Sequence, residues 1–465
     1  MKGVEQLSSV IVAELSAIFD QSSVLTDPGD CLPYGYDNSR RQAMPQAVVF
    51  AQNHEQIKSL VQLCYQHQIN LIARGRGTGT TGATVPDQGG IVLSLERMNN
   101  ILEIDPDNRL AKVEPGVTNQ QLQSAAKEHG FFWAPDPSSS AICTIGGNLA
   151  YNSAGPRAVK YGTPRENALG LRAITGKGEE IRTGVETSKG VVGYDLTRLL
   201  IGSEGTLAII TEATLKLTPL PETKQTLRAT YKDMLSAAQA VSAIMAQPVT
   251  PCALEFMDGS AIDLIRNSSG LGLAPDVKAM LMLEVDGPKH CIDESVEAVA
   301  TAARGPGLID LQMAKTETEI SQLWKARQSL SPALRKIAPK KINEDVVVPV
   351  SRIPELISGL EKLSVASGIT IVNFGHAGNG NIHVNLLTDP DDPEKMQQAY
   401  SCLDKAFDLV LQLGGTLSGE HGVGLEKRDY ISREIDPVTL GLMADIKKQF
   451  DPANILNPGK LFPPE

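Results

Sequence analysis

A short apolar strand that runs directly into four glycines constrains this chain more than any other stretch. The segment LIARGRGTGTTGATVP spans residues 71–86 and has glycines at positions 75, 77, 79 and 82. Glycine adopts positive φ and has no Cβ, so successive backbone N–H groups can turn toward an anion that approaches the main chain. Added charge and hydroxyl donors favour a pyrophosphate over a lone carboxylate, and they come from Arg74, Arg76, Thr78, Thr80 and Thr81. The segment therefore predicts a pyrophosphate-binding loop.

Residues 77–82 also match G-x-G-x-x-G, the fingerprint of dinucleotide-binding βαβ units. That fingerprint requires a helix immediately after the loop. Pro86, Gly89 and Gly90 oppose a helix here, and the next expected element is a strand over 91–95. We therefore reject a Rossmann fold and expect a pyrophosphate loop of another fold. A glycine-rich hairpin without a ligand is the alternative at this point.

Length, charge and cysteine usage limit the class of protein. A chain of 465 residues predicts two or three domains, and a net charge of −11 argues against nucleic acid or an anionic membrane as the main partner. No apolar run reaches the ~18 residues that span a bilayer, and Glu5 and Glu14 interrupt the N-terminal segment, so we expect neither signal peptide nor anchor. The six cysteines form no CxxC pair and are expected to be reduced thiols. We expect a cytoplasmic protein, with a peripheral position at the inner membrane as the alternative.

Hydrophobic periodicity and turn residues predict the elements around the loop. In the first part of the chain we expect helices over 4–20, from Asn53 onward and over 118–130, with strands over 91–95, 101–104 and 110–113. Beyond residue 222 we expect an α/β sandwich with strands over 226–231, 254–257, 280–285 and 309–315, and helices over 233–246, 292–303 and 317 to about 337.

Two further glycine-rich segments have the composition of ligand-wrapping loops. Residues 135–163 contain few long apolar side chains, but they offer main-chain and amide donors at Gly146, Gly147, Asn148, Asn152 and Gly155. Residues 201–211 form a tight Ser-Glu-Gly-Thr turn that leads into an apolar strand. Three separated segments of this kind indicate one extended, flat, polar ligand.

The three segments together resemble a known family. RGRGTGTTGATVP, PDPSSSAICTIGGNLAYNSAGP and GSEGTLAIIT, in this order, are similar to the FAD-binding domain of the vanillyl-alcohol-oxidase fold, in the branch of D-lactate and D-2-hydroxyglutarate dehydrogenases. The resemblance covers roughly residues 44–222 and resumes at the C-terminus. It implies an α+β protein with a two-subdomain FAD-binding domain, an α/β-sandwich cap domain and a helical C-terminal segment.

The resemblance also implies domain limits and cofactor contacts. We expect an N-terminal helical segment over 1–43, the FAD-binding domain over 44–222, a substrate and cap domain with a metal site over 223–422, and a C-terminal segment over 423–465 that returns to the FAD domain. Relatives with covalently attached flavin carry histidine where this chain has Thr78, so we expect non-covalent FAD. The implied FAD contacts are Arg74, Gly75, Arg76, Gly77, Thr78, Gly79, Thr80, Gly82, Pro135, Asp136, Thr144, Gly146, Gly147, Asn148, Asn152, Gly155, Glu204, Gly205, Ile209, Ile210 and Asn457.

Histidines in two later glycine-rich stretches point to a metal. His376 and His383 flank the turn signal Ala-Gly-Asn-Gly-Asn, so their imidazoles can meet at the mouth of a hairpin. Two imidazoles and a carboxylate suit Zn²⁺ or Mn²⁺ with an open position, and Glu420 is the natural third ligand. Adjacent residues seldom both face one ion, which leaves His421 as a base beside it. The resembled dehydrogenases use these motif positions in the same roles.

The combination predicts a FAD- and metal-dependent D-2-hydroxyacid dehydrogenase. His421 would remove the hydroxyl proton while the Cα hydrogen leaves as hydride to the flavin. The resemblance places the substrate-carboxylate arginine at Arg327. No iron–sulfur or haem motif is present, so we expect an external electron acceptor, namely a quinone, a cytochrome or an electron-transfer flavoprotein. We also weigh a homodimer. A zinc hydrolase and a non-catalytic flavin-binding subunit of a glycolate-oxidase-like complex are the alternatives of other classes.

The preferred substrate is the least constrained prediction. Expected substrate contacts are Arg327, Ser331, Lys341 and Asn385. D-2-Hydroxyglutarate enzymes of the resembled branch keep a lysine six residues before the proline that corresponds to Pro349, and that position is Asn343 in this chain. A distal carboxylate without its cation in a partly dry pocket loses several kcal/mol. We therefore predict D-lactate or a similar short acid, with D-2-hydroxyglutarate as the second choice and Lys341 as its substitute cation.

Overall fold

The computed structural model describes residues 6–266 and 269–463, and the chain divides into two compact units. Unit 1 comprises Met1–Ala154, Gly162–Leu220 and Glu420–Glu465, and unit 2 comprises Gly155–Tyr161 and Pro221–Gly419. The sequence did not distinguish residues 155–161 from the segments that flank them. No helix in the described ranges has the length and apolar character needed to cross a membrane.

The first sheet of unit 1 has the order β1-β2-β4-β3. Strands β2, β4 and β3 are parallel, and β1 pairs with β2 in the antiparallel sense. Helix α3 links β2 to β3 and begins after Asn53, whose side chain accepts a hydrogen bond from the Gln56 N–H. The elements of this part are α1 (Ser9–Ile18), β1 (Val24–Leu25), α2 (Pro28–Cys31), β2 (Ala47–Phe50), α3 (His54–His67), β3 (Leu71–Arg74) and β4 (Ile91–Ser94).

Helix α1 is shorter than the helix that the sequence predicts over 4–20, and residues 4 and 5 lie outside the described ranges. It begins after Ser8, whose hydroxyl accepts a hydrogen bond from the Ile11 N–H, and ends at Ile18. The serine therefore sets the first turn through the usual N-cap geometry.

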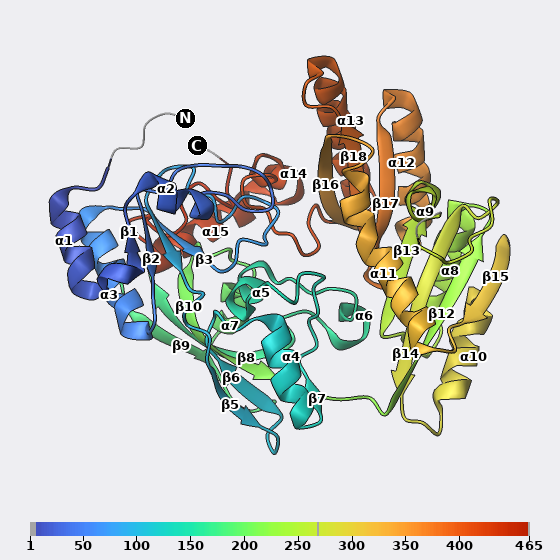
Figure 1. The fold of residues 1–465 in the computed structure, drawn as a ribbon, viewed down its shortest axis with the longest axis horizontal. Helices are drawn as coiled ribbons and strands as arrows, with labels where there is room; N and C mark the ends of the chain where they lie inside the picture. The colour runs from blue at the N-terminus through green and yellow to red at the C-terminus, as the bar shows by residue number, and fades with distance from the viewer. Residues whose placement is uncertain (1–5, 267–268, 464–465) are drawn as a thin grey trace. The chain divides into compact units, whose positions relative to one another are not determined.

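A second sheet in unit 1 is antiparallel, with the order β5-β6-β10-β8-β9 (Figure 1). Strands β7 and β11 form a separate two-stranded ribbon. The elements are β5 (Ile101–Asp105), β6 (Leu110–Val113), α4 (Asn119–Glu128), β7 (Phe131–Phe132), α5 (Ile145–Tyr151), β8 (Ala168–Thr175), β9 (Glu180–Gly184), α7 (Leu196–Leu200), β10 (Ala208–Lys216) and β11 (Thr218–Pro219).

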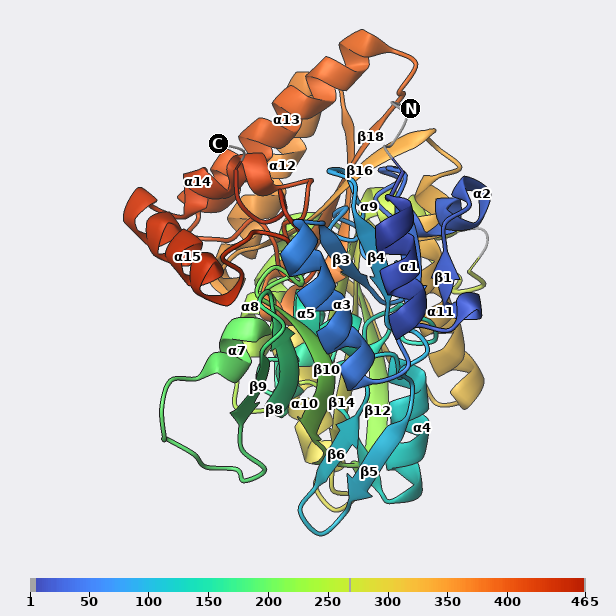
Figure 2. The ribbon, with the colours of Figure 1, turned by 90° about the vertical axis from the view of Figure 1, so that its left-hand side faces the viewer.

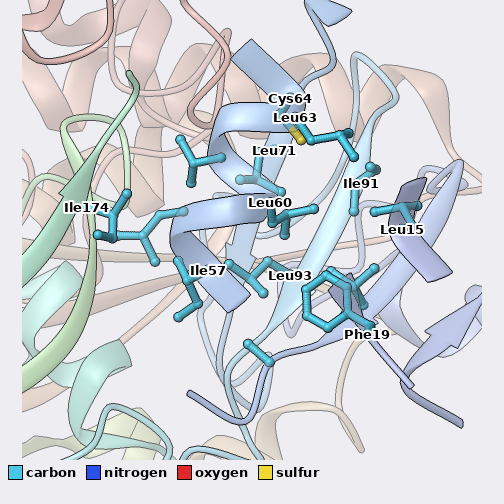
Figure 3. Packing of buried hydrophobic residues seen from close by; sticks show 14 of the residues in the cluster. Leu15, Phe19, Ile57, Leu60, Leu63, Cys64, Leu71, Ile91, Leu93 and Ile174 are labelled. Atoms are coloured by element: carbon cyan, nitrogen blue, oxygen red, sulfur yellow. The ribbon is translucent and has the colours of Figure 1, made fainter. Parts of the chain in front are cut away.

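Helix α3 joins the two sheets of unit 1 into one core. Ile57 and Leu60 of α3 are fully buried, and their cluster includes Leu71 and Ile91 of the parallel sheet and Ile174 of the antiparallel sheet (Figure 3). Burying an aliphatic side chain of this size contributes about 1.5–3 kcal/mol. The helix therefore fixes the strand β3, and with it the start of the glycine-rich loop.

The C-terminal part of the chain completes the edge of β3. The Leu71 N–H donates to the Ile455 carbonyl at 2.8 Å, and the Asn457 N–H donates to the Leu71 carbonyl at 2.9 Å. Asp451 is buried and accepts hydrogen bonds from the backbone N–H groups of Ile455 and Leu456, which holds this return segment in place. This return segment comes after the helices α14 (Ile431–Glu434) and α15 (Pro437–Phe450) in the chain.

Unit 2 is built on a seven-stranded antiparallel sheet with the order β15-β12-β14-β13-β17-β18-β16. Its strands are β12 (Thr223–Tyr231), β13 (Ala253–Asp258), β14 (Ala279–Gly287), β15 (Leu308–Met313), β16 (Lys340–Val347), β17 (Thr370–His376) and β18 (Asn381–Thr388). Every expected strand between 223 and 337 is present with its ends shifted by a few residues. The sandwich order inferred from the sequence is therefore confirmed.

Helices cover both faces of this sheet (Figure 2). On one face, α9 (Gly259–Ile265) and α11 (Glu317–Leu334) pack against Met257, Val372 and Phe374. The other face carries α8 (Met234–Ala246), α10 (Ile292–Ala303), α12 (Ile353–Ser367) and α13 (Pro393–Gln412). The short helix α6 (Ala158–Tyr161) also belongs to unit 2.

Candidate active site

The glycine-rich loop after β3 packs so closely on helix α5 that side chains at its glycines would not fit. A Cβ at Gly75 would lie 2.5 Å from the Thr144 hydroxyl, and a Cβ at Gly79 would lie 2.6 Å from the Tyr151 hydroxyl. Thr144 is the N-cap of α5 and accepts a hydrogen bond from the Gly147 N–H at 3.2 Å. The loop 75–79 thus lies along the first and last turns of a single short helix.

Helix α5 lies inside the segment 135–163, where the sequence predicted only a loop. Gly146 and Gly147 have low helix propensity, so the residues of this segment did not predict a helix. The helix forms because Thr144 caps it and because Ile145 and Leu149 are buried in the core of the antiparallel sheet.

Arg74 has a different role from the expected phosphate contact. Its guanidinium is buried and donates to the Tyr36 carbonyl at 2.8 Å and to the Thr84 hydroxyl at 3.2 Å. Burial lowers the pKa of this guanidinium, and the neighbouring Asp37 carboxylate opposes that effect. Arg74 therefore stabilises the loop through contacts within the protein. Arg76, in contrast, is half-exposed, and its Nε lies 3.3 Å from the Glu96 carboxylate.

The buried polar atoms without a hydrogen-bond partner among the described residues include two that belong to predicted FAD contacts. They are the Thr80 hydroxyl and the side-chain oxygen of Asn457. The amide nitrogen of Asn457 donates to the Glu204 carbonyl at 2.8 Å, which fixes the side chain and leaves its buried oxygen as the unpaired atom. Because buried polar atoms are nearly always paired, these two atoms fit a polar ligand such as FAD.

Several other predicted cofactor contacts are used within unit 1 itself. The Asn152 side-chain oxygen accepts from the Thr163 hydroxyl and from the Arg165 N–H, both at 3.0 Å. Asn148 is buried and accepts from Asn119, which also donates to the Pro135 carbonyl. These side chains stabilise the segment, and FAD contacts at its main chain stay a prediction. Gly155 lies outside unit 1, in the short segment of unit 2.

Glu204 in the Ser-Glu-Gly-Thr turn holds a distant loop. Its buried carboxylate accepts from the Val423 N–H at 2.6 Å and from the Gly424 N–H at 2.8 Å. Burial raises the pKa of the Glu204 carboxyl to about 7, against the opposing effect of those two N–H donors. The sequence predicted Glu204 only as a cofactor contact. Its carboxylate in fact fixes the stretch that directly follows His421.

His376, His383 and Glu420 come together as the sequence predicted. Each offers one ligand atom, and the three atoms lie within 4.8 Å of one another. The two imidazoles come from the facing ends of β17 and β18, with ring centroids 5.2 Å apart and ring planes at 84°. Two nitrogen donors and one carboxylate at this separation fit a single Zn²⁺ or Mn²⁺ ion.

Asp345 fixes the chain just before Glu420. This fully buried aspartate lies opposite His383 in the β16–β18 register. Its carbonyl and one carboxylate oxygen accept from the Gly419 N–H at 2.8 and 2.9 Å. The position of Glu420 beside the hairpin therefore follows from strand β16, a link that the sequence alone did not indicate.

Glu255 is a further site residue, and the sequence did not predict it. It lies opposite His376 in the β13–β17 register, with its side chain 1% exposed. One carboxylate oxygen is 2.5 Å from His376 Nδ1, and the other accepts from Arg327 Nε at 2.6 Å. Burial raises the pKa of this carboxyl, but the His376 and Arg327 charges outweigh it and bring the pKa to about 2. Glu255 is therefore an anion at neutral pH.

Polar residues from four strands of the unit 2 sheet lie on one of its faces. Directly paired residues of neighbouring strands share a face, which groups Glu255, His376, His383, Asn343 and Lys341.

Helix α11 packs on that face and contributes Arg327 and Ser331. Lys341 Nζ donates to the Ser331 hydroxyl at 2.7 Å, so these two expected contacts are neighbours.

Asn385 does not fit its expected role as a substrate contact. Its side chain is fully buried, and the amide nitrogen donates to the carbonyls of Val372 and His383. The amide oxygen accepts from Asn343 at 2.7 Å. Because the amide donors are satisfied within the sheet, Asn385 stabilises the strands that carry the histidines.

Comparisons with known proteins identify the family of this chain. Residues 45–184 match the FAD binding domain family, and residues 220–461 match the family described as FAD linked oxidases, C-terminal domain. The chain is 41% identical to the glycolate oxidase subunit GlcD of Bacillus subtilis over 93% of its own length and 92% of that protein. It is 36% identical to a D-lactate dehydrogenase of Archaeoglobus fulgidus over 97% of its own length and 98% of that protein.

Solved structures support the fold. The structure of p-cresol methylhydroxylase with substrate bound aligns with a TM-score of 0.78 at 19% identity, covering 98% of this chain and 96% of that one. The resemblance to the vanillyl-alcohol-oxidase fold is thereby confirmed, with its FAD-binding and cap domains. The chain belongs to the FAD-linked oxidase family.

Proposed function

We propose that this chain is a FAD- and metal-dependent dehydrogenase that oxidises D-lactate, or a similarly short D-2-hydroxy acid, to the 2-oxo acid. The observation that carries the proposal is the grouping of His376, His383 and Glu420, together with Glu255, which contacts both His376 and Arg327. Relatives named as a glycolate oxidase subunit and as D-lactate dehydrogenases support a 2-hydroxy acid substrate.

The residues of this chain suit the steps of such an oxidation. Bound FAD would supply a hydride acceptor, and a divalent ion on the two histidines and Glu420 would supply Lewis acidity toward the substrate hydroxyl. Arg327 binds the substrate carboxylate through its two Nη groups, which fixes the orientation of Cα. His421 follows Glu420 directly in the chain and accepts the hydroxyl proton on its imidazole.

We further propose that electrons leave to an external acceptor, a quinone, a cytochrome or an electron-transfer flavoprotein. The six cysteines are free thiols at scattered positions, and they form no cluster suited to an iron–sulfur centre. We therefore expect the reduced flavin to pass its electrons to an acceptor outside this chain.

D-2-Hydroxyglutarate is the second candidate substrate, and one observation favours it. Lys341 lies on the same sheet face as Asn343, beside Ser331 of α11. The Lys341 ammonium could pair with the distal carboxylate of D-2-hydroxyglutarate, a role that Asn343 cannot fill because it carries no charge. Lys340, the preceding residue, points to the other face of the strand, with its Nζ 5.9 Å from the Tyr400 ring centre. It is therefore a matched control.

Substrate oxidation is tested by anaerobic bleaching of the bound flavin and by steady-state rates with an artificial acceptor. We expect bleaching by D-lactate and not by L-lactate, and a higher kcat/KM for D-lactate than for D-2-hydroxyglutarate.

A tenfold preference for D-2-hydroxyglutarate that is lost in Lys341→Ala but kept in Lys340→Ala would overturn the choice of substrate. A yellow protein whose flavin no D-2-hydroxy acid bleaches would instead be a non-catalytic subunit.

A further inference from the structure

One buried carboxylate contacts both the metal-site histidine and the substrate arginine of the proposed reaction. Glu255 is in the middle of β13 with its side chain 1% exposed. Its two oxygens are divided between two partners, with His376 Nδ1 at 2.5 Å and Arg327 Nε at 2.6 Å. The partners come from different elements, the strand β17 and the helix α11.

We infer that Glu255 is a positioning residue that locks the metal ligand and the carboxylate-binding arginine into one unit, so that binding at either site depends on the other. The inference rests on the proposed function, because it assigns the roles of His376 and Arg327 from it. Glu255 itself contacts neither the metal nor the substrate in this assignment.

On the histidine side, the contact selects the ring nitrogen that faces the metal. A carboxylate at Nδ1 fixes the tautomer with the proton on that nitrogen, so Nε2 is the ligand atom. It also fixes the ring orientation, which stands at 84° to the ring of His383. Carboxylates in this position raise the basicity of the ligand and typically contribute 10- to 100-fold in metal affinity.

On the arginine side, the contact leaves the recognition groups available. Glu255 takes Nε of Arg327, and the Nη groups donate to no residue in the described part of the chain. The guanidinium carbon is 4.7 Å from the centre of the Phe374 ring, which supports one face of the group. A guanidinium held at Nε and on its face presents its remaining donors in a fixed plane, the geometry that binds a carboxylate in bidentate fashion.

A second buried glutamate on the same sheet face provides a matched control. Glu284 of β14 is 3% exposed and accepts from Lys224 at 2.8 Å, Thr226 at 3.0 Å and Trp324 at 2.8 Å. It has a comparable burial and number of partners, but it contacts neither His376 nor Arg327. Glu284→Gln therefore measures how the loss of a buried charge from this sheet, without the contacts to His376 and Arg327, affects metal affinity and KM.

The test compares Glu255→Gln with Glu284→Gln in flavin-loaded protein. Resident metal is removed by chelation, Zn²⁺ or Mn²⁺ is titrated calorimetrically in the absence of substrate, and kcat and KM for D-lactate are measured separately. We expect Glu255→Gln to weaken metal binding about 10- to 100-fold and to raise KM. Glu284→Gln should keep both values near those of the wild type. Equal metal affinity and KM in Glu255→Gln and wild type would overturn the inference.

Arg327→Lys tests the same contact from the other side, and it serves if Glu255→Gln does not fold. Lysine keeps the charge but removes the Nε donor to Glu255. If Arg327 only binds substrate, Arg327→Lys should leave the metal affinity of substrate-free protein unchanged. We expect instead that this variant binds the metal severalfold more weakly than the wild type. Unchanged metal affinity in Arg327→Lys would contradict the coupling.

Different results would refute the proposed function and the role of Glu255. If wild-type protein binds metal but oxidises no D-2-hydroxy acid, the proposed function fails and the metal titrations still decide the role of Glu255. If wild-type protein binds neither Zn²⁺ nor Mn²⁺, the metal site and the inference both fail, and FAD binding stands.

Discussion

Substituting Gly77 by alanine should damage the glycine-rich loop far more than the same substitution at Gly89. Both glycines have similar positive φ values, 66° at Gly77 and 71° at Gly89. A Cβ at Gly77 would lie 2.6 Å from the guanidinium carbon of Arg74, whereas a Cβ at Gly89 would meet no atom of the described residues within 4 Å beyond its own chain neighbours. The pair therefore separates the clash with Arg74 from the backbone cost of a left-handed alanine.

The expected magnitudes follow from these contacts. A left-handed alanine costs about 1–2 kcal/mol, which is the whole effect expected at Gly89. At Gly77 the guanidinium must also move away from the Tyr36 carbonyl and the Thr84 hydroxyl. Hydrogen bonds from a charged donor contribute about 1.5–3 kcal/mol each, so losing one or both adds about 1.5–6 kcal/mol. With the backbone cost, we expect a total of about 3–8 kcal/mol for Gly77→Ala.

Urea unfolding of unit 1 measures the difference. Trp133 is a fully buried reporter in unit 1, and a Trp324→Phe background removes the signal from unit 2. FAD affinity is measured in parallel by fluorescence, and it should fall in Gly77→Ala and be retained in Gly89→Ala. If the two variants lost the same stability to within about 0.5 kcal/mol, Arg74 would not be a rigid support of the loop.

Three further predictions follow from the site. Chelation, or His383→Ala, should abolish turnover and leave the bound flavin spectrum nearly unchanged; full activity of the chelated protein would refute the metal assignment. His421→Ala should lower kcat by ~10²- to 10⁴-fold with normal metal content, and loss of metal would make His421 a ligand instead of a base. Burial raises the pKa of Glu204 and of Asp258 to about 7, from 4.5 and 3.8. Between these values the folded state binds more protons than the unfolded state, so the free energy of unfolding contributed by both groups falls as the pH rises from about 4 through 7. Urea midpoints at pH 5 and 7.5 should show a smaller pH difference in Glu204→Gln than in the wild type, and an unchanged difference would contradict the shift at Glu204.

Local patterns predicted the parts of the site that lie close together in the sequence. His376 and His383 flank a turn of glycine and asparagine, and Gly380 adopts the left-handed conformation that this turn needs. The strands on either side then pair in the register that brings the imidazoles together. Glu420 was predicted because the ion needs a third ligand of suitable chemistry, and the three ligand atoms do gather.

Contacts between distant strands and helices were beyond prediction from the residues. Glu255 sits in ALEFMD, and nothing in that hexapeptide distinguishes an anchored carboxylate from a solvated one. Its role depends on a register with β17 more than a hundred residues later.

Arg74 was misread for the same reason, because its acceptors at Tyr36 and Thr84 come from the folded loops around it. Helix α5 was missed because its glycines lower helix propensity while its cap and buried side chains stabilise it.

The pairing of Leu71 with residues 455–457 affects the order of events during synthesis. The edge of β3 stays open on the ribosome until all of unit 2 has been made, because its partner follows in the chain. An open strand edge is a template for pairing with other chains. Chains that end before residue 455 would therefore lack the backbone partner of β3, which supports the flavin loop, and they would be prone to aggregate. We expect stable FAD binding only in chains that include residues 455–457.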